Sequence, residues 1–506
     1  MPLPRTAQLD HKYVWHPFTQ MRDWLGREPI VIVEGRGATL LDERGNEYLD
    51  ANSSIWTNLH GHRHPTITRA IRDQLRRIAH SSALGLANEP AARLAQRLIH
   101  AANVKSPRAR DAATPRPRDA ASGPPLAKVF YSDDGSTAME VALKLAYEYA
   151  RRTRGIRRPK FLSLENAYHG DTVGAVSLGH IDLFHRAYSG MLFRSDQVMS
   201  PYCYRCPFNL AKPERGDART YRQCKWECVG LVEQKLAAQK RQGAPYAGFV
   251  VEPLMQGAAG MIAQPSGWLG KVQDLARHHG APLIADEVMT GFGRTGSFFA
   301  CHAEGVRPDF MAVAKGLTGG YLPMAATLTT QAVFDAFLGD YAEFKTFFHG
   351  HSFTGNQLGA AAALASLDLL ASADSRARRL RLETTLRDSL HELWTSPQVG
   401  DIRQVGLVAG VELVADWTSR RPFDLREKVG IRVCEAMARR GVLTRPIGNV
   451  IVLMPPYVTT PRQARKMVAA LGEAIAETLG GRIPNNRKPS GATRGGARRR
   501  IQKHDD

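Results

Sequence analysis

The sequence predicts an α/β fold built on a mostly parallel sheet, and three observations support this prediction. Strand-like apolar runs alternate with helix-like stretches from about residue 126 to residue 330, as they do in folds with parallel sheets. Two of these runs, at residues 282–285 and 310–314, are short and bounded by acidic residues or glycines, which is typical of strands covered on both faces. The chain has 506 residues, which is enough for a large core and more than one domain.

The composition is that of a soluble globular protein. Hydrophobic residues make up 43% of the chain and charged residues 23%, which is ordinary for such proteins. No apolar run reaches the length of a membrane span, and residues 1–15 lack the apolar core of a signal peptide. Six cysteines in so long a chain fit a reducing compartment, so we expect a cytoplasmic protein with no membrane partner.

The formal net charge of +20 raises the question of nucleic-acid binding. Much of the excess is local, because residues 481–506 carry eight Lys or Arg against two Asp, and residues 105–125 carry five basic against two acidic residues. Both segments are rich in Pro, Gly, Ala and Arg, which is typical of loops and disordered tails. We therefore interpret them as additions to the fold and expect no specific nucleic-acid partner.

The N-terminal hundred residues contain an arm, a small sheet and two helices. Residues 13–24 form an unusually aromatic arm, and residues 31–50 alternate as strands do, with turns at Gly35, Gly37 and Gly45. Two amphipathic helices are predicted within residues 65–104, and Asn88 marks the start of the second.

Residues 128–150 combine a strand, a tight turn and a helix. The strand covers residues 129–131, and apolar residues recur at helical spacing from Ala138 to Tyr149. Gly135 and Ser136 lie in the turn where the helix begins, so free backbone N–H groups and the helix dipole could bind a phosphate there. An ordinary β–α turn is the alternative. The polar turn at residues 349–354 is a second candidate phosphate-binding turn.

The ends of the predicted strands carry the candidate catalytic residues. Asp286 follows the run at 282–285, and Lys315 follows the run at 310–314. Ligands of open α/β sheets bind beyond the carboxyl ends of the strands. A lysine that forms a Schiff base and an aspartate that holds a pyridinium nitrogen are the two protein groups that pyridoxal phosphate chemistry needs. Strand-end residues of these types are also common without any role, so the pair alone leaves both explanations open.

Two further strand ends carry polar or aromatic residues. Tyr168 follows a strand and could stack on a flat cofactor ring, and Glu252 ends the strand at residues 249–252. After residue 375 helices return, followed by strands at residues 408–413 and 450–454. Arg445 lies between a helix and one of these strands, where its guanidinium could bind a substrate carboxylate through two hydrogen bonds. An ordinary surface arginine is the alternative.

One glycine motif resembles a nucleotide-binding fingerprint. Gly291, Gly293 and Gly296 match G-x-G-x-x-G. That fingerprint requires a strand directly before the glycines and a helix directly after them. Residues 286–290 intervene, and residues 297–301 lack a helix-start signal, so we reject a nicotinamide site.

Two groups of residues could bind a metal ion. His60, His62 and His64 alternate, but no cysteine or acidic residue at ligand spacing accompanies them, so we favour a loop near the ligand. Residues 201–228 form an excursion with two cysteine pairs, which leaves a zinc knuckle or four reduced thiols as alternatives. The possible zinc ligands are Cys203, Cys206, Cys224 and Cys228. A zinc-dependent binding or regulatory protein is thus the rival from another functional class.

Six motifs in order show that the chain, from about Tyr13 to Leu479, resembles the class III, fold-type I pyridoxal-phosphate aminotransferases. The motifs are WHPFTQM at 15–21, AYHGDT at 167–172, DEVMTGFGRTG at 286–296, AKGLTGGYLPMA at 314–325, FFHGHSFTGNQLG at 347–359 and LTRPIGNVIVLMPP at 443–456. The resemblance implies a large α/β domain at 71–372, a smaller α+β domain from residues 1–70 and 373–480, and a tail at 481–506. The arm motif is similar to the biotin-pathway branch, which aminates 8-amino-7-oxononanoate.

The resemblance also implies a role for each motif residue. Lys315 would form the Schiff base with pyridoxal phosphate and move the proton during transfer, Asp286 would keep the pyridinium nitrogen protonated, and Tyr168 would stack on the ring. Gly135 and Ser136 would bind the phosphate. The turn at Gly350, His351 and Ser352 would complete the phosphate site from the partner subunit of a homodimer with shared active sites. The implied substrate-binding residues are Phe18, Trp56, Tyr168, Asp171, Gly350 and Arg445.

Three positions differ from the pattern of this branch and leave the amino donor open. Phe18 stands where tyrosine is frequent, Ile55 replaces the first of two tryptophans, and Val452 stands where some members have tyrosine. S-adenosylmethionine and lysine are both used as donors within the branch. An ω-amino-acid or ornithine-type aminotransferase is a further alternative.

Overall fold

The computed structural model describes residues 3–104 and 123–480. The tail at residues 481–506 lies outside the described residues, as does most of the insert at residues 105–125. Within the described part, the α/β fold predicted from the sequence is confirmed.

A seven-stranded sheet forms the centre of the larger lobe. Its strands are Leu126–Ser132 (β4), Phe161–Leu164 (β5), Asp196–Val198 (β6), Gly248–Val251 (β7), Leu283–Asp286 (β10), Phe310–Val313 (β11) and Ala325–Thr330 (β12). They are arranged in the order β4-β12-β11-β10-β7-β5-β6. The pairs from β11 to β6 are parallel, whereas β12 runs antiparallel to both of its neighbours. The sheet is therefore mostly parallel, as predicted.

Helices bury both faces of this sheet, because side chains alternate along each strand. Ile284 and Phe310 belong to the core on one face, and Leu283 and Ala285 belong to the core on the other. The first face packs against Gly135–Arg154 (α6), Val173–Leu178 (α7) and Gln331–Asp335 (α13). The second face packs against Glu89–Asn103 (α5), Glu227–Arg241 (α10), Trp268–His278 (α11) and Gln357–Ala371 (α14).

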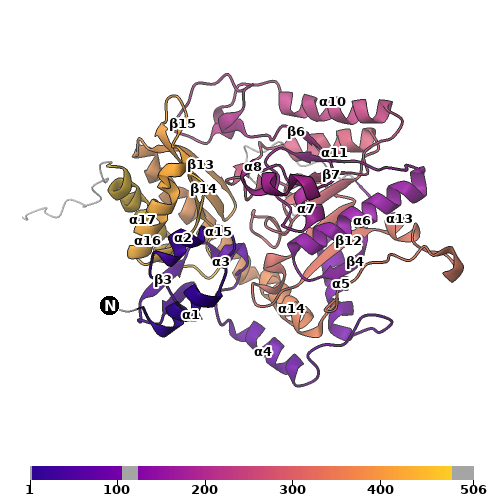
Figure 1. Ribbon diagram of the computed structural model, residues 1–506, viewed down its shortest axis with the longest axis horizontal. Helices are drawn as coiled ribbons and strands as arrows, with labels where there is room; N and C mark the ends of the chain where they lie inside the picture. Colours follow the sequence, from indigo (N-terminus) through magenta and orange to yellow (C-terminus); the bar gives the residue numbers. More distant parts are fainter. Residues whose placement is uncertain (1–2, 105–122, 481–506) are drawn as a thin grey trace, which may run out of the picture.

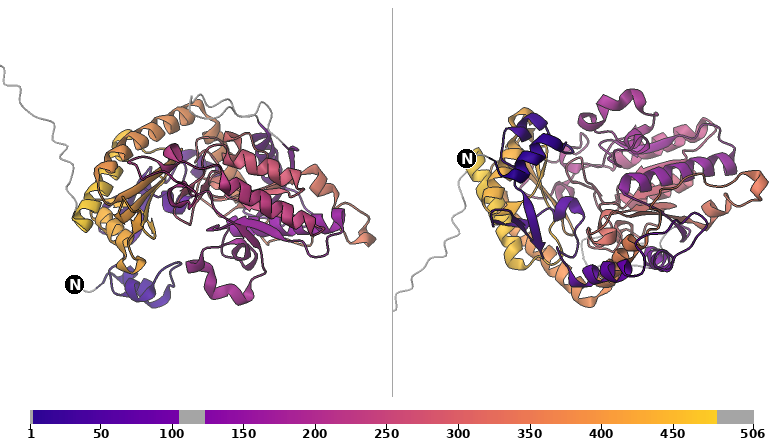
Figure 2. Two further views of the ribbon diagram at one scale, coloured as in Figure 1. Left: turned by 90° about the horizontal axis from the view of Figure 1, so that it is seen from above. Right: turned by 60° about the horizontal axis from the view of Figure 1, so that its bottom comes forward.

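Both ends of the chain contribute to one small sheet in the second lobe. Ile32–Arg36 (β1), Thr39–Asp42 (β2) and Glu47–Asp50 (β3) form the antiparallel sheet predicted for residues 31–50. Val442–Leu443 (β16) joins β3 in parallel. Figure 1 shows the indigo N-terminal elements beside the yellow C-terminal ones, and both views in Figure 2 agree.

A five-stranded sheet completes the second lobe. Its strands are Val399–Val405 (β13), Val408–Asp416 (β14), Arg421–Pro422 (β15), Pro446–Ile447 (β17) and Val450–Leu453 (β18). The helices around it are Ala373–His391 (α15), Val429–Arg439 (α16) and Pro461–Leu479 (α17). Leu390, Met437 and Leu471 from these helices share a core with Val411 of β14. The division at residues 70, 372 and 480 remains a prediction.

The shorter elements connect these layers. They are Arg5–Tyr13 (α1), Met21–Leu25 (α2), Ser53–Trp56 (α3), Pro65–Leu75 (α4), Asp182–His185 (α8), Ala218–Tyr221 (α9), Ala300–Ala303 (α12), Met255–Gln256 (β8) and Ile262–Ala263 (β9). The two helices predicted within residues 65–104 are α4 and α5. Asn88 caps α5, since its side chain accepts a hydrogen bond of 2.9 Å from Ala91 N.

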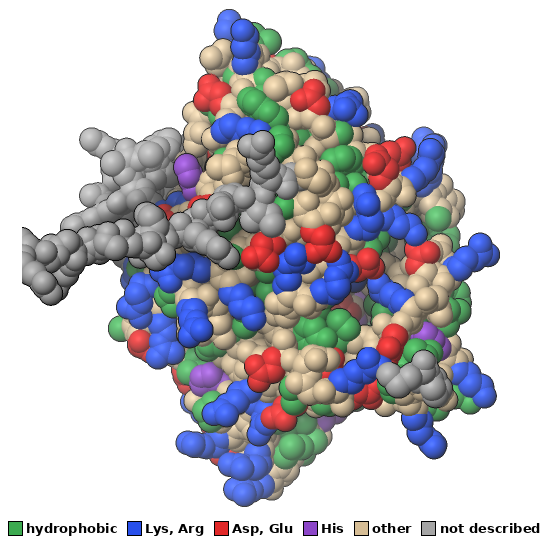
Figure 3. All heavy atoms as spheres, turned by 90° about the vertical axis from the view of Figure 1, so that its left-hand side faces the viewer, with side chains coloured by type: hydrophobic (Ala, Val, Ile, Leu, Met, Phe, Trp, Pro, Cys, Tyr) green, Lys and Arg blue, Asp and Glu red, His purple; other side chains and the backbone are tan. Residues whose placement is uncertain are grey.

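No single helix among the described residues is long and apolar enough to cross a membrane. One pair, Gln357–Ala371 with Ala373–Thr395, passes by length and composition when combined, although it bends by 71°. On the face shown in Figure 3, Lys and Arg side chains are interspersed with Asp and Glu rather than gathered in one patch.

Candidate active site

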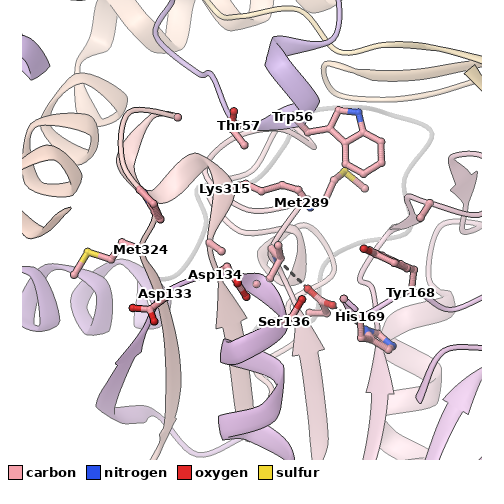
Figure 4. A pocket seen from close by; sticks show the side chains of 18 of the residues that line it. Trp56, Thr57, Asp133, Asp134, Ser136, Tyr168, His169, Met289, Lys315 and Met324 are labelled. Atoms are coloured by element: carbon pink, nitrogen blue, oxygen red, sulfur yellow. Dashed lines mark hydrogen bonds and ion pairs between the residues drawn. The ribbon is translucent and has the colours of Figure 1, made fainter. Parts of the chain in front are cut away.

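A pocket lies beyond the carboxyl ends of the parallel strands, where ligands of open α/β sheets bind. Lys315 and Asp286 both line it, as predicted from their positions at the ends of β11 and β10. Figure 4 shows Lys315 extending toward Met289, with Trp56 above it and Tyr168 across the pocket. The remaining lining residues include Thr57, Asp133, Asp134, Gly135, Ser136, His169, Gly170, Glu252, Ala258, Val288, Ala314 and residues 320–324.

Lys315 lies where burial disfavours its charged form. Burial lowers the pKa of its ammonium group, and the carboxylates of Asp286, Glu252 and Asp171 oppose that shift. Its Nζ lies 5.1 Å from the centroid of the Trp56 ring. A buried lysine with a lowered pKa can act as a nucleophile or base near neutral pH.

Asp286 is held in the pocket by a histidine that the sequence analysis did not select. His169 Nδ1 lies 2.7 Å from Asp286 Oδ2, and Val288 N donates to Asp286 Oδ1 at 3.1 Å. Both side chains are buried, so the carboxylate has a fixed orientation. A signal was present in the sequence, because His169 directly follows Tyr168 in the motif at 167–172. Its partner, however, lies 117 residues away.

Glu252 is a second buried carboxyl group beside Asp286. Its Oε1 accepts a hydrogen bond of 3.2 Å from Tyr168 N, and its Oε2 accepts one of 2.7 Å from Gly257 N. Burial raises the pKa of Glu252 to about 7, and the nearby Asp286 carboxylate adds to that shift. Glu252 thus ties two pocket-lining loops together and can exist as a neutral acid.

The N-terminus of α6 forms one end of the pocket. Asp134 caps this helix by accepting a hydrogen bond of 2.9 Å from Thr137 N. In the described part of the chain, no acceptor occupies the N–H groups of Gly135 and Ser136, which begin the helix. A Cβ on Gly135 would lie 2.6 Å from Val288 Cγ1, so only glycine fits this approach. The sequence-predicted phosphate turn therefore lies in the same pocket as Lys315.

Aromatic residues extend from the pocket toward the N-terminal arm. Tyr168 OH donates to Asp171 Oδ2 at 2.7 Å. The ring of Phe184, which the sequence analysis missed, lies edge-on to both Tyr168 and Phe18, with centroid distances of 6.4 and 5.3 Å. Arg445 Nη2 donates to the carbonyl oxygen of Phe18 at 3.0 Å and thereby anchors the arm.

The structure does not place every predicted site residue on the pocket wall. The pocket is lined by Lys315, Asp286, Tyr168, Gly135, Ser136 and Trp56. Phe18, Asp171 and Arg445 lie outside the lining and connect to it through the contacts above. The turn at Gly350, His351 and Ser352 also lies outside the lining, although His351 Nδ1 approaches Asp133 Oδ2 at 3.5 Å.

The predicted metal sites find no support among residues 3–104 and 123–480, where no three His, Cys, Asp or Glu side chains are arranged to hold a metal ion. Cys203, Cys206, Cys224 and Cys228 are free cysteines, and the choice between a zinc knuckle and four reduced thiols stays a prediction. His60 and His62 have other partners, since His60 Nε2 contacts Ser366 Oγ at 3.0 Å and His62 Nε2 contacts Asp50 Oδ2 at 3.1 Å.

The pocket fits a flat, anionic cofactor that carries an aldehyde. It combines a buried amine on Lys315, an oriented carboxylate on Asp286, an aromatic ring on Tyr168 and a helix N-terminus at Gly135. The same set of groups was predicted from the sequence for pyridoxal phosphate. The structure adds that they line one pocket.

Comparison with known proteins agrees with this arrangement. Residues 22–475 match the family Aminotransferase class-III. The chain belongs to the class III aminotransferases. Enzymes of this family depend on pyridoxal phosphate and adopt fold-type I, so the predicted fold class and cofactor are those of the family. The glycine motif at 291–296 belongs to an aminotransferase and not to a nicotinamide enzyme.

Relatives with a named activity span nearly the whole chain. The adenosylmethionine-8-amino-7-oxononanoate aminotransferase of Nitratidesulfovibrio vulgaris is 48% identical over 476 residues, which cover 93% of this chain and 81% of that protein. The crystal structure of the enzyme with the same name from Methanocaldococcus jannaschii is 36% identical, with a TM-score of 0.83 and coverage of 94% and 99%. An amine transaminase from an uncultivated Pseudomonas species, solved with bound cofactor, is 31% identical, with a TM-score of 0.81 and coverage of 92% and 98%.

Proposed function

We propose that this protein transfers an amino group to the ketone of 8-amino-7-oxononanoate and yields 7,8-diaminononanoate, a step of biotin synthesis. S-adenosylmethionine is the proposed donor. The observation that carries the proposal is the meeting of Lys315, Asp286 and the N-terminus of α6 in one pocket. The named activity of relatives up to 48% identical supports the choice of acceptor and donor.

Each pocket group has a proposed task toward pyridoxal phosphate. Gly135 and Ser136 would hold the phosphate through their backbone N–H groups, Tyr168 would cover the ring, and Lys315 would hold the aldehyde carbon. Asp286, oriented by His169, would keep the ring nitrogen protonated. When bound, the cofactor supplies an electron sink for the carbanion that forms at the carbon bearing the amino group.

Lys315 is the proposed base. Since burial lowers the pKa of its ammonium group, Nζ can take a proton from a substrate carbon and return it within the pocket. Trp56 and Tyr168 border the space in front of Lys315, where a bound substrate would displace water. The rate is thus proposed to come from a positioned base in a site that excludes water.

Arg445 is the proposed anchor for the substrate carboxylate. Its guanidinium is exposed, and one of its five N–H groups is used by the carbonyl oxygen of Phe18. The others can bind a carboxylate with two parallel hydrogen bonds. Phe18, Trp56, Tyr168 and Asp171 would then border the chain of the substrate between Arg445 and Lys315.

We further propose a homodimer whose active sites are shared. The turn at Gly350, His351 and Ser352 lies outside the lining of its own pocket, which leaves it available to a neighbouring one. Phe348 and Phe353, beside this turn, have exposed fractions of 75% and 57% in the single chain. Exposed aromatic rings of this size are typical of surfaces that bind a partner.

The test is a pair of half-reactions followed in the visible spectrum. Purified, cofactor-loaded protein is mixed with S-adenosylmethionine, or separately with lysine, and 8-amino-7-oxononanoate is then added. We expect the cofactor band to disappear with S-adenosylmethionine and to return with the ketone. A response to lysine alone would replace the proposed donor. A band that the ketone does not restore would refute the acceptor and favour another class III activity.

A further inference from the structure

A left-handed turn carries Trp56 to the pocket. Ser53, Ser54, Ile55 and Trp56 have φ values of 48°, 48°, 62° and 68°, and none of them is glycine. In this region the Cβ atom approaches the following carbonyl oxygen, so non-glycine residues adopt it singly and rarely in runs. Four consecutive residues in this conformation require strong contacts from outside the turn.

Asp50 provides those contacts on the N-terminal side of the turn. Its carboxylate accepts hydrogen bonds from Ser54 N at 3.0 Å and from Ser54 Oγ at 2.9 Å. The ring of His62 contacts the same carboxylate at 3.1 Å, and Asp50 itself is buried. In addition, Ser53 Oγ donates to the carbonyl oxygen of Met454 at 2.6 Å.

Arg294 provides the contacts on the C-terminal side. Its guanidinium donates to the carbonyl oxygens of Trp56 at 3.3 Å, Asn58 at 3.0 Å and Pro455 at 3.0 Å. The side chain is 1% exposed, and its charge lies 5.1 Å from the centroid of the Tyr457 ring. A buried arginine that binds three carbonyl oxygens fixes the backbone that carries them.

The glycine motif that resembled a nucleotide fingerprint serves this arginine. Gly293 and Gly296 flank Arg294 with φ values of 92° and 96°, which glycine adopts without strain. Around them the chain makes a turn that directs Arg294 into the protein interior. In this structure the motif therefore positions Arg294, which differs from the phosphate binding of a nucleotide loop.

The side chain at the end of the turn, Trp56, lines the pocket. Trp56 Nε1 is buried and finds no hydrogen-bond partner among the described residues. The ring also packs on the loop at Gly257, where a Cβ would lie 3.4 Å from Trp56 Cζ3.

We propose that Asp50 and Arg294 are positioning residues for the substrate. They hold the turn at residues 53–56 in its left-handed conformation and so fix the Trp56 indole, which lines the pocket beside Lys315 where the acceptor substrate would bind. This inference rests on the proposed function for the identity of the substrate, but its account of the turn does not depend on that identity.

Kinetics of single and double variants test the coupling in the loaded enzyme. We expect Trp56→Phe and Asp50→Asn each to lower kcat/KM for the ketone by about ten- to a hundredfold, mostly through KM. Because both act through one side chain, Asp50→Asn should add no further loss in the Trp56→Phe background. Ser54→Ala removes only the hydrogen bond from Ser54 Oγ to Asp50, at an exposed residue, and we expect it to lower kcat/KM less than Asp50→Asn does.

Asp42→Asn is the matched control. Asp42 is also a buried strand-end carboxylate that holds a turn, since it accepts from Arg44 N at 3.0 Å, Asn46 N at 2.8 Å and Tyr48 OH at 3.0 Å. It contributes nothing to the pocket lining. We expect its replacement to reduce stability without changing KM. An equal rise in KM would show that any damage to the small sheet has this effect and would overturn the proposal.

Hydrogen exchange gives a readout that does not require turnover. In the wild-type protein, the amides of residues 50–62 should exchange slowly, and Asp50→Asn or Arg294→Met should accelerate their exchange at least tenfold, whereas Asp42→Asn should not. Unchanged exchange in this segment, or additive kinetic losses in the double variant, would overturn the inference. If wild-type protein fails to use the ketone but the exchange pattern holds, the proposed function fails and the role of Asp50 and Arg294 in the turn stands.

Discussion

At the scale of single residues, Lys315 is the group on which the proposed chemistry depends most. It lies at the end of β11, it is buried, and its pKa is lowered by that burial. We expect Lys315→Ala to reduce turnover by about 10²–10⁴-fold, the range for loss of a positioned base. Steady-state assays would measure this, with Lys271→Ala, on the surface of α11, as the control. Full turnover in Lys315→Ala would refute the assignment.

Glu252 predicts a specific pH dependence of stability. Its folded-state pKa is raised to about 7 from an ordinary value of 4.5, so the folded state favours the protonated acid. The stability that this group contributes is complete below its unfolded pKa and is lost as the pH rises through 7. The amide side chain in the Glu252→Gln variant cannot ionise. The free energy of unfolding of this variant, relative to that of the wild type, should therefore rise by on the order of 3 kcal/mol between pH 4.5 and 8.

Urea unfolding of both proteins at several pH values measures this difference. The glutamine also loses one acceptor for Tyr168 N or Gly257 N, but that cost is the same at every pH. The slope of the difference with pH therefore isolates the ionisation of Glu252. Parallel stability curves would contradict the prediction.

The sequence could identify some site residues because strand ends are visible in it. Lys315 and Asp286 each follow a short apolar run, and the topology rule for α/β sheets then brings them together. His169 and Glu252 could not be assigned a task in this way. Their partners, Asp286 and Tyr168, are 117 and 84 residues away in the sequence, and only the fold brings each pair into contact.

At the scale of elements, the start of α6 is the proposed anion site. A Cβ on Gly135 would lie 2.6 Å from Val288 Cγ1 and would push the helix away from the strand end. We expect Gly135→Ala to weaken pyridoxal phosphate binding by about tenfold, since one or more N–H groups of the helix start would be displaced. Equilibrium dialysis or quenching of tryptophan fluorescence would measure the affinity.

Gly155 at the opposite end of α6 offers the matched control. Its φ is 65° and a Cβ there would meet nothing within 4 Å. Gly155→Ala should therefore cost about 1 kcal/mol of stability through backbone strain and leave cofactor affinity unchanged. If both alanines weaken binding equally, the effect comes from the helix as a whole and not from its N-terminus.

Most elements follow from periodicity, but two features do not. Alternation predicted β1 to β3, and helical spacing predicted α4, α5 and α6. Nothing in the sequence predicts that β12 enters the sheet antiparallel between β4 and β11, because this order depends on how the helices pack. Nor does it predict the left-handed turn at residues 53–56, since turn predictions rely on glycine or asparagine and this turn has neither.

At the scale of the whole molecule, a buried ionic network joins the second lobe to the pocket loops. Arg403 of β13 contacts Asp401 at 2.9 Å and Glu412 at 2.7 Å, and it donates to the carbonyl oxygen of Met261 at 2.7 Å. Tyr202 also donates to Glu412. Arg403 is 2% exposed, so losing its charge would leave the Asp401 carboxylate buried without its cation, while Glu412 would keep only Arg205 as a cationic partner.

We therefore expect Arg403→Met to destabilise the protein by about 3–5 kcal/mol, the cost of breaking a buried ion pair. Chemical unfolding would measure it. Arg426→Met is the control, because Arg426 is 93% exposed and its contact with Asp424 at 3.8 Å should contribute at most about 1 kcal/mol. Similar losses in the two variants would show that the network does not stabilise the fold.

The joint sheet of β3 and β16 has a consequence for synthesis of the protein on the ribosome. Ala51 N donates to Leu443 O, and Met454 N donates to Ala51 O, so β3, which pairs locally with β2, gains its second partner almost 400 residues later. The large α/β sheet can assemble while translation continues, but this lobe cannot. Nascent chains should therefore contain the finished large sheet before the wall around Trp56 is complete, and they should acquire activity only after residues 442–454 have left the ribosome.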